Sequence, residues 1–575
     1  MKASDYTVHF LKNQGVTCVF EMSGGMITHL LDSLYSIGGI RIVSVRHEQS
    51  AAFAADAVGR LTRIPGVAMA TSGPGATNLL TGIGSCYFDS SPAVFITGQV
   101  NRDELKGDRG IRQLGFQETD IVSIARPITK AAWQVQTLEE LPQLLQRAFN
   151  LAVKGRPGPV LLDIPMDIQR SDMSTPVENI KNQITEAPVL DTHFLQEILI
   201  QIETAKRPLI LVGGGIRASL ATDLLRNLVR KMGIPVVCSL MGIGVLPYSD
   251  PLRVGMIGSY GNRWANLTIA RSDLLVVLGS RLDVRQTGSQ TKAFRGDRTI
   301  FHVDCELGET NNRITGCNVI ISDLRQFLTK MLQLVEGREF NEREEWLTEI
   351  NDLKRSWPDV KELGNIVGIN PNVFMHKLSA VSKEAAVYVS DVGQHQMWAA
   401  QSLEIDHNQR FITSGGMGSM GFGLPAAIGA AFAVSPKPVV VIAGDGGFQS
   451  NIQELQTVMH NQLPIKIIIL NNHCHGMVRQ FQESYFEGRY QSTLWGYSAP
   501  DFTSIALAYG MQAKTIEKEN EVEQALRWLW NTPKAALLQV KIDTLANAYP
   551  KIAFGSPNTE MEPFSKGKAN SIDVE

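Results

Sequence analysis

A carboxylate and an amide each follow a short apolar run near the C-terminal end of this chain. Gly444-Asp445-Gly446 comes directly after the run at residues 439–443, and Asn472 follows the run at residues 465–470. Such runs are typical of buried parallel strands, and open parallel sheets bind ligands outside the carboxyl ends of their strands. Mg²⁺ takes a carboxylate and a neutral oxygen together with phosphate oxygens. The pair therefore predicts a clamp for a Mg²⁺-bound diphosphate, with a plain glycine turn as the alternative.

The segment after Asp445 is expected to be helical. The pattern places the start of the helix near Ser450, with Gln453 three residues later in a capping-box arrangement. A helix N-terminus behind a glycine turn attracts anions, whereas a carboxylate repels them. A cation between Asp445 and the anion removes this conflict, which again favours a metal-bound diphosphate.

A second glycine cluster precedes this region. Gly416-x-Gly418-x-x-Gly421 has the spacing of dinucleotide-binding loops, which also need an acidic residue at the end of a later strand. The candidate acid, Asp445, lies within a glycine turn of its own, so a ribose contact is the weaker interpretation. A tight turn that packs a helix on a strand needs the same glycines and stays open.

Three α/β domains are expected to position these residues. The chain has 575 residues, of which 44% are hydrophobic, and this suits about three domains of roughly 150–200 residues. Short β-branched runs alternate with helical patterns, as in doubly wound parallel sheets covered on both faces. Polar stretches at residues 169–192 and 336–364 separate the sheets. The predicted domains are 1–170, 190–335 and 365–548, followed by a tail at 549–575 that orders on contact or stays flexible.

Composition and charge exclude several classes of protein. The net charge of −3 provides no basic field for nucleic acids or acidic membranes. The six cysteines are scattered without a C-x-x-C spacing, which favours a reducing compartment over a disulfide framework or a zinc cluster. The N-terminus has the pattern of an amphipathic helix rather than a signal peptide, and no apolar run approaches the ~18 residues of a membrane span. We therefore expect a cytoplasmic protein.

Nine stretches in order along the chain resemble one enzyme family. Together they resemble thiamine diphosphate (ThDP) enzymes of the acetolactate synthase-like type, which are FAD-containing carboligases. The resemblance implies a pyrimidine-binding, a central FAD-binding and a diphosphate-binding domain. The stretches are RHEQSAAFAADAVGR, TSGPGATNLLTGI, GFQETDIV, GRPGPVLLDIP, VGGG, DVGQHQMWAAQ, GMGSMGFGLPAAIGA, GDGGFQSNIQELQTV and NNHCHGMVRQFQE.

The resemblance implies catalytic and cofactor-binding roles in the first and third domains. Glu48 resembles the glutamate that protonates the aminopyrimidine ring of ThDP, although an acid in a first helical turn also suits the helix dipole. His47 beside it would shuttle protons or simply pack. Met420 resembles the apolar wedge that bends the cofactor, with a core methionine as the alternative. The implied Mg²⁺ ligands are Asp445, Asn472 and the backbone near Cys474, Gln117 beside Phe116 would orient the substrates, and the other implied ThDP contacts are Gly73, Asn78, Gln394, His395, Gly418, Gly444, Gly446, Gly447 and Met477.

The middle domain resembles the flavin-bearing form of the family. In such carboligases FAD is mainly structural and has no net redox role. Glycines after a strand allow a phosphate to approach the backbone closely, and an acid at a strand end suits a ribose or adenine contact. The implied FAD residues are Arg156, Gly213, Gly214, Gly215, Gly279, Arg281, Arg285, Asp304 and Asp323.

Five positions depart from the family pattern, and the resemblance implies that they line the channel to the acceptor pocket. The family usually has Lys, Met-His, Asp and Trp where this chain has Met166, Ser259-Tyr260, Val284 and Phe481. The residues implied for ThDP are unchanged. Donor chemistry is therefore expected to be intact beside a wider acceptor pocket with different polar partners. Drift within a genuine acetolactate synthase is the alternative.

The resemblance implies an enzyme that decarboxylates pyruvate and transfers the two-carbon unit to a carbonyl acceptor. The altered channel, and a C-terminal segment similar to those of sugar-modifying homologues, favour a non-standard ketone such as a nucleotide-linked ketosugar. The alternatives are an acetolactate synthase catalytic subunit that uses two pyruvates, with or without a regulatory small subunit, a pyruvate oxidase-like flavoenzyme, and a non-catalytic scaffold, against which Glu48 counts. In the family different subunits hold the two ends of ThDP, so a homodimer or homotetramer with active sites at the interface is expected.

Overall fold

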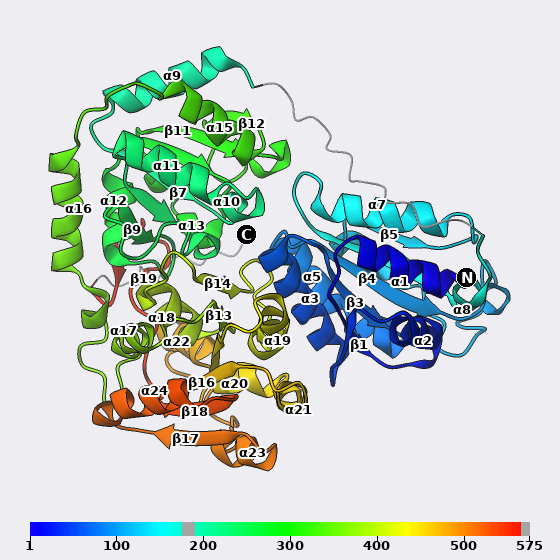
Figure 1. Ribbon diagram of the computed structural model, residues 1–575. Helices are drawn as coiled ribbons and strands as arrows, with labels where there is room; N and C mark the ends of the chain where they lie inside the picture. Colours follow the sequence, from blue (N-terminus) through cyan, green and yellow to red (C-terminus); the bar gives the residue numbers. More distant parts are fainter. Residues whose placement is uncertain (175–189, 565–575) are drawn as a thin grey trace.

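The computed structural model describes residues 1–174 and 190–564. In this part of the chain three parallel sheets of six strands each are flanked by helices. Figure 1 shows the first domain in blue to cyan, the middle domain in green, and the third in yellow-green to red. The three doubly wound α/β domains predicted from the alternation of apolar runs and helical patterns are confirmed.

The first domain has the strand order β2-β1-β3-β4-β6-β5. Its strands are β1 (Cys18–Met22), β2 (Arg41–Ser44), β3 (Gly66–Ala70), β4 (Ala93–Gln99), β5 (Ala131–Gln134) and β6 (Pro159–Pro165). Its helices are α1 (Ala3–Asn13), α2 (Thr28–Ile37), α3 (Glu48–Thr62), α4 (Pro74–Asn78), α5 (Leu80–Phe88), α6 (Ile121–Ala125), α7 (Leu141–Val153) and α8 (Met166–Arg170). The central strands β3, β4 and β6 are buried along their whole length, because helices cover both faces.

The middle domain has the order β12-β11-β10-β7-β8-β9, which is the doubly wound arrangement of dinucleotide-binding folds. Its strands are β7 (Pro208–Val212), β8 (Val236–Cys238), β9 (Arg253–Met256), β10 (Leu274–Leu278), β11 (Thr299–Asp304) and β12 (Asn318–Ile321). Its helices are α9 (Thr192–Thr204), α10 (Gly215–Ala218), α11 (Thr222–Met232), α12 (Arg263–Arg271), α13 (Val284–Thr287), α14 (Thr291–Arg295) and α15 (Leu324–Leu334), and α16 (Glu344–Ser356) leads on to the third domain.

The third domain has the order β14-β13-β15-β16-β18-β17. Its strands are β13 (Val387–Ser390), β14 (Arg410–Thr413), β15 (Val439–Gly444), β16 (Ile465–Asn471), β17 (Gln512–Ile516) and β18 (Ala536–Lys541). Its helices are α17 (Pro371–Val381), α18 (Gln394–Ser402), α19 (Gly423–Ala433), α20 (Asp445–Gln449), α21 (Leu455–His460), α22 (Gly476–Tyr485), α23 (Phe502–Ala508) and α24 (Val522–Asn531).

The first and third domains repeat one topology. Both sheets run second, first, third, fourth, sixth, fifth strand when each domain is numbered from its own start. The domains pack through α3 and α19, which lie against each other in Figure 1. A methyl group added at Gly429 of α19 would lie 2.1 Å from the carbonyl oxygen of Ala54 in α3. The helices therefore approach this closely only because Gly429 has no side chain.

The end of the described chain packs on the middle domain. Strands β19 (Lys551–Ile552) and β20 (Met561–Glu562) form a small antiparallel sheet. The backbone N–H of Ile552 donates to Ser259 at 2.8 Å, and the Arg263 guanidinium donates to the carbonyl oxygen of Met561 at 3.0 Å. Residues 549–564 are thus ordered, and they connect the third domain to the middle domain. Across the two described segments, no helix is long and apolar enough to cross a membrane.

Candidate active site

Asp445 and Asn472 leave neighbouring strands at the same edge of the third sheet. Strands β15 and β16 pair in parallel, with Gly444 opposite Leu470, so the residues that follow them emerge side by side. The strand order reverses between β13 and β15, and ligands of open α/β sheets bind at such a switch point. This placement agrees with the prediction that Asp445 and Asn472 each follow a buried strand.

The predicted helix start at Ser450 is wrong. Helix α20 already begins at Asp445, because extended Gly444 takes the N-cap position and the chain passes from strand to helix without a loop. Ser450 instead follows the last residue of that helix, and Gln453 lies in a 3₁₀ turn, where its side chain donates to Asn451. The Ser-to-Gln spacing resembles a capping box but caps no helix here.

Three oxygen atoms converge here, namely the side-chain oxygen of Asn472, the carbonyl oxygen of Cys474 and Oδ1 of Asp445. The Asn472 amide donates to Gln394 Oε1 at 2.9 Å, and its own oxygen then lies 2.9 Å from the carbonyl oxygen of Cys474 and 3.3 Å from Asp445 Oδ1. Turning the amide over would satisfy these two oxygens but would place oxygen against Gln394 Oε1. A divalent cation suits the first orientation, because Mg²⁺ takes one carboxylate with neutral oxygens. Within residues 1–174 and 190–564, no group of three or more His, Cys, Asp or Glu offers a metal site.

Burial perturbs the acid–base behaviour of Asp445. Its side chain is buried, and this raises its pKa to about 6, an effect that a hydrogen bond from the Tyr497 hydroxyl at 2.9 Å partly offsets. A bound cation would favour the ionised form and lower this pKa again. Tyr497 comes from the loop between α22 and α23, and no motif in the sequence pointed to it.

His395 packs against Gly444, the last residue of β15. Its Nε2 atom is buried and has no hydrogen-bond partner, and burial lowers the pKa of the ring to about 3. The neutral imidazole therefore offers a free polar atom at the switch point, which suits a diphosphate contact. A methyl group at Gly444 would lie 2.8 Å from His395 Nδ1, and one at Gly446 would lie 2.6 Å from the His475 ring. Both glycines are needed for this close packing.

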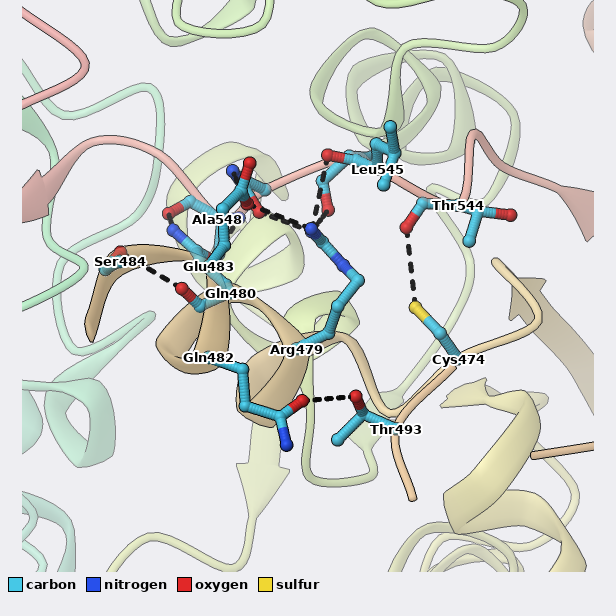
Figure 2. A network of polar contacts seen from close by, with 12 residues as sticks. Cys474, Arg479, Gln480, Gln482, Glu483, Ser484, Thr493, Thr544, Leu545 and Ala548 are labelled. Carbon is cyan, nitrogen blue, oxygen red and sulfur yellow. Dashed lines mark hydrogen bonds and ion pairs between the residues drawn. The ribbon is translucent and has the colours of Figure 1, made fainter. Parts of the chain in front are cut away.

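The segment after Asn472 is anchored by α22 and the chain at residues 544–548. The Cys474 thiol lies 3.4 Å from the carbonyl oxygen of Thr544, and the buried Arg479 guanidinium donates to Ala546 at 3.0 Å. Gln394 donates to the same Ala546 oxygen at 2.9 Å. Figure 2 shows Arg479 at the centre of this network, with Cys474 and Thr544 at its edge. The network fixes the backbone carbonyl that faces Asn472, and Met477 lies partly buried on the first turn of the same helix.

The glycine loop before α19 closes the other side of the site. Gly418 has φ +66°, in the region that favours glycine, and Met420 beside it is 41% exposed. Buried Asp391 holds this loop, since it accepts the backbone N–H groups of Gly421 and Gly423 at 3.0 and 2.8 Å. Met420 is thus an exposed side chain on a braced loop rather than a core methionine. Asp391 was missed, although its place directly after β13 could have suggested it.

In the first domain, buried Glu48 pairs with partly buried Asn78. Glu48 is the first residue of α3, capped by His47, and is 8% exposed. Its Oε2 accepts the Asn78 amide at 2.9 Å. His47 Nδ1 accepts the backbone N–H of Gln49 at 3.1 Å, so His47 serves as a cap in this structure.

Gln117 and Gly73 lie against each other near this pair. A methyl group at Gly73, which has φ +62°, would lie 3.0 Å from Gln117 Cβ. Gln117 itself has φ +65°, a conformation that is costly for a residue other than glycine and is often found at functional sites. Phe116 beside it is 77% exposed. The structure therefore brings Gly73 and Gln117 together and leaves Phe116 on the surface of the single chain.

The two clusters are separate within one described chain. No hydrogen bond or ion pair between described residues joins Glu48 to Asp445 or Asn472. The two regions are connected through neighbouring residues. The Asn451 side-chain oxygen accepts the Ser50 hydroxyl at 3.1 Å, and its amide nitrogen donates to Gln49 Oε1 at 3.3 Å. The chain thus carries two separate clusters of polar residues, one at the sheet edge of each repeated domain.

A large cavity opens where all three domains meet. Its volume is about 400 Å³, within the range of ligand pockets. It lies at the switch point between β7 and β10, whose following glycines Gly214 and Gly279 line it. The other residues assigned to FAD that line it are Gly215, Arg156, Arg281, Arg285, Asp304 and Asp323.

Gly213 does not line this cavity. A methyl group there would lie 2.1 Å from the carbonyl oxygen of Gly279, so Gly213 serves the packing of β7 against β10.

Arg156 is already paired with Glu306 at 3.3 Å and with Glu309 at 2.5 Å. Asp323 caps α15 by accepting two backbone N–H groups. These contacts fix the walls of the cavity.

The five residues that differ from the usual family pattern do not form one cluster. Ser259 and Tyr260 line the large cavity, whereas Val284 is 53% and Phe481 47% exposed. Phe481 packs on Tyr485 with ring centroids 4.7 Å apart. Met166 begins α8 in the first domain, whereas Phe481 lies on α22 of the third domain.

Known families and known proteins match this chain along almost its entire length. The chain matches three families, described as thiamine pyrophosphate enzyme N-terminal TPP binding domain (residues 1–124), central domain (195–331) and C-terminal TPP binding domain (391–540). It is 38% identical to acetolactate synthase isozyme 2 large subunit of Escherichia coli, covering 98% of this chain and 99% of that protein. It is 36% identical to the Lactococcus lactis acetolactate synthase large subunit, covering 97% and 95%, and 36% identical to the Arabidopsis thaliana chloroplastic enzyme, covering 96% and 83%. The chain is a ThDP-dependent enzyme and belongs to the acetolactate synthase family.

Proposed function

We propose that this enzyme decarboxylates pyruvate with ThDP and Mg²⁺ and joins the two-carbon unit to a second 2-oxo acid, so that pyruvate alone yields 2-acetolactate. The observation that carries the proposal is the convergence of oxygens from Asp445, Asn472 and Cys474 beside the unpartnered nitrogen of His395. The relatives named above are acetolactate synthases and match this chain along almost its entire length, which supports the same reaction for this enzyme.

Residues of the third domain would hold the charged end of the cofactor. Asp445, Asn472 and the Cys474 carbonyl would bind Mg²⁺, and His395 with the backbone around Gly446 would face the diphosphate. When bound, ThDP supplies the electron sink for the carbanion left by loss of CO₂. The buried setting of Asp445 and His395 keeps water from competing for these contacts.

Glu48 would hold a proton on the aminopyrimidine ring. The Asn78 amide fixes the carboxyl group through Oε2, which leaves Oε1 to exchange the proton. Because the Glu48 and Asp445 half-sites of one chain share no contact, we propose that each active site pairs Glu48 of one subunit with Asp445 of another. A homodimer is the smallest assembly that provides this arrangement.

FAD is proposed to occupy the large cavity. The cavity lies at the dinucleotide switch point, and eight of the nine residues assigned to FAD line it. Absorbance of the purified protein near the flavin bands, with release of FAD on denaturation, tests this directly. A pyruvate oxidase-like activity would in addition bleach the flavin when pyruvate is added under anaerobic conditions.

The expectation of a nucleotide-linked ketosugar as acceptor is not supported by the comparisons. The relatives are named acetolactate synthases, which favours the alternative weighed from the sequence. A larger ketone is kept as a second candidate on one observation, which is that Phe481 is half-exposed where the family has the larger indole.

One experiment separates the two acceptors. The enzyme is incubated with pyruvate alone and with pyruvate plus a panel of 2-oxo acids and larger ketones, and the products are identified by mass spectrometry. Efficient formation of 2-acetolactate from pyruvate alone supports the proposal. CO₂ release that depends on a larger ketone, with no 2-acetolactate, would overturn it in favour of the second candidate.

A further inference from the structure

Three arginines from three different domains face one small cavity. Arg63 follows the last turn of α3, Arg217 lies in α10 and Arg410 begins β14. All three line a cavity of about 60 Å³ beside the large one. We call this group the arginine pocket. The remaining residues that line the small cavity are Arg60, Asp89, Ser90, Gly214, Ala218, Leu240, Met241, Phe411, Ile412 and Thr413.

None of the three arginines is neutralised by the described part of the chain. No ion pair between described residues includes Arg63, Arg217 or Arg410. The Nε and Nη2 atoms of Arg217 and the Nε atom of Arg410 are buried without a hydrogen-bond partner. The one side-chain bond of Arg410 goes to the carbonyl oxygen of Arg60 at 3.3 Å.

Arg60, in the same wall, provides a comparison. Its guanidinium donates to Asp56 at 2.8 Å and to Asp89 at 2.9 Å, so its charge is matched by two carboxylates. Asp89 is further occupied by the backbone N–H groups of Gly415 and Gly416. Asp56 and Asp89 are therefore already hydrogen-bonded to other groups, and no carboxylate among the described residues forms an ion pair with Arg63, Arg217 or Arg410.

Burial and mutual repulsion both disfavour the charged forms of the arginines in this pocket. Burial lowers the pKa of Arg217, and the nearby Arg410 and Arg226 lower it further. Burial also lowers the pKa of Arg410 to about 10, with added repulsion from Arg63 and Arg60. For Arg63 burial lowers the pKa, and Asp323 acts in the opposite direction. Buried cations of this kind are costly unless an anion compensates them.

The backbone at Arg63 points to a role for its side chain. Arg63 has φ +67° at the C-cap of α3, the position where glycine is strongly preferred because it carries no Cβ. An arginine is retained there at a conformational cost. The strain is understandable if the guanidinium is needed inside the pocket.

The arginine pocket adjoins the large cavity. The same residues form part of both walls, so an anion in the pocket would lie next to a ligand in the larger space. The shared lining residues are Arg63, Asp89, Ser90, Gly214, Ala218, Leu240 and Met241.

We propose that Arg63, Arg217 and Arg410 form a binding site for a phosphoryl-type oxyanion. Guanidinium groups recognise phosphate oxygens through paired N–H donors, and three of them from different directions suit a dianion. The anion is either free phosphate or the phosphate of a nucleotide that extends from the large cavity. The inference does not depend on which acceptor the enzyme uses.

Thermal unfolding of the purified protein tests this site, with FAD bound for the phosphate titration and with FAD removed for the nucleotides, because FAD and ADP would compete for the large cavity. Inorganic phosphate is titrated at constant ionic strength against chloride, and ADP is compared with adenosine. We expect a saturable rise in Tm, since a ligand that binds only the folded state stabilises it. Saturation by phosphate alone identifies the free anion, and saturation by ADP but neither phosphate nor adenosine identifies a nucleotide-borne group.

Variants decide whether the arginine pocket is responsible. Arg63→Gly suits the left-handed backbone, and Arg217→Gln relieves repulsion, so both should fold without a lower Tm in phosphate-free buffer. Each is expected to weaken anion binding by about tenfold or more. Arg527→Gln, at an exposed arginine paired with Glu523, should bind as the wild type does. The proposal is overturned if no anion raises the Tm, or if Arg63→Gly and Arg217→Gln respond as Arg527→Gln does.

Discussion

The Tyr497 hydroxyl donates a hydrogen bond of 2.9 Å to Oδ2 of Asp445, while Oδ1 of the same carboxylate faces the Asn472 side chain at 3.3 Å. The two carboxylate oxygens therefore have different tasks. Tyr497 holds one of them, and the other is turned toward the remaining oxygens of the proposed Mg²⁺ site. Outer contacts of this kind orient metal ligands.

Replacing Tyr497 with Phe should loosen this arrangement. The loss of the hydroxyl leaves Oδ2 without its donor, so we expect Mg²⁺ affinity in the presence of ThDP to fall about tenfold. Isothermal titration calorimetry at pH 8 measures it, where Asp445 is ionised in both proteins. Tyr509→Phe, at the tyrosine that directly follows α23, is the control. Unchanged Mg²⁺ affinity would show that Tyr497 does not position the carboxylate.

The raised pKa of Asp445 predicts a pH dependence of both stability and metal binding. Burial raises its pKa from 3.8 to about 6, so the folded protein takes up this proton before the unfolded chain does. Without metal, this group should make the fold more stable by about 1 kcal/mol as pH falls from about 7 to about 5. Mg²⁺ binding should weaken over the same window, because the cation needs the ionised form.

The variant Asp445→Asn isolates this effect from other buried acids such as Asp163 and Asp391. In metal-free buffer, the stability of the variant relative to the wild type should be greater at pH 7 than at pH 5. Denaturant unfolding at the two pH values measures the difference. An equal difference at both values would mean that Asp445 titrates normally.

Mixing two inactive variants tests whether the active site is shared between subunits. Glu48→Gln and Asp445→Asn should each abolish pyruvate decarboxylation. In a mixed dimer, one of the two sites would combine the intact Glu48 of one subunit with the intact Asp445 of the other. After co-refolding we expect about a quarter of the wild-type rate, because about half of the dimers are mixed. If both half-sites worked within one chain, the mixture would remain inactive.

Position 481 offers a test of acceptor selection. Phe481 is half-exposed beside Tyr485, so Phe481→Trp fits without a large loss of stability. We expect CO₂ release from pyruvate to be unchanged and the ratio of products from competing pyruvate and 2-oxobutyrate to change several-fold, because the larger ring narrows the pocket. Phe486→Trp, at a neighbouring half-exposed phenylalanine, provides the matched control. An identical product ratio in all three proteins would remove Phe481 from the acceptor pocket.

The sheets and the placement of Asp445 and Asn472 at strand ends were predictable for a common reason. Buried parallel strands appear in the sequence as continuous apolar runs, and functional groups follow those runs directly, as Asp445 and Asn472 do. The helix start was wrong because the Ser450–Gln453 spacing is a local signal. The chain geometry at Gly444 overrode it by starting the helix five residues earlier.

The contacts that the sequence did not predict join distant segments. Tyr497 reaches Asp445 from 52 residues away, and Asp391 holds a loop that begins about 30 residues later. The arginine pocket draws one residue from each of three domains. The sequence by itself determined the α/β class, the family and the polar residues at each strand end, because apolar periodicity and motifs lie within short segments of the chain. Only the tertiary structure decided which side chains face one another and which charges stay unpaired, since both depend on how separate domains pack.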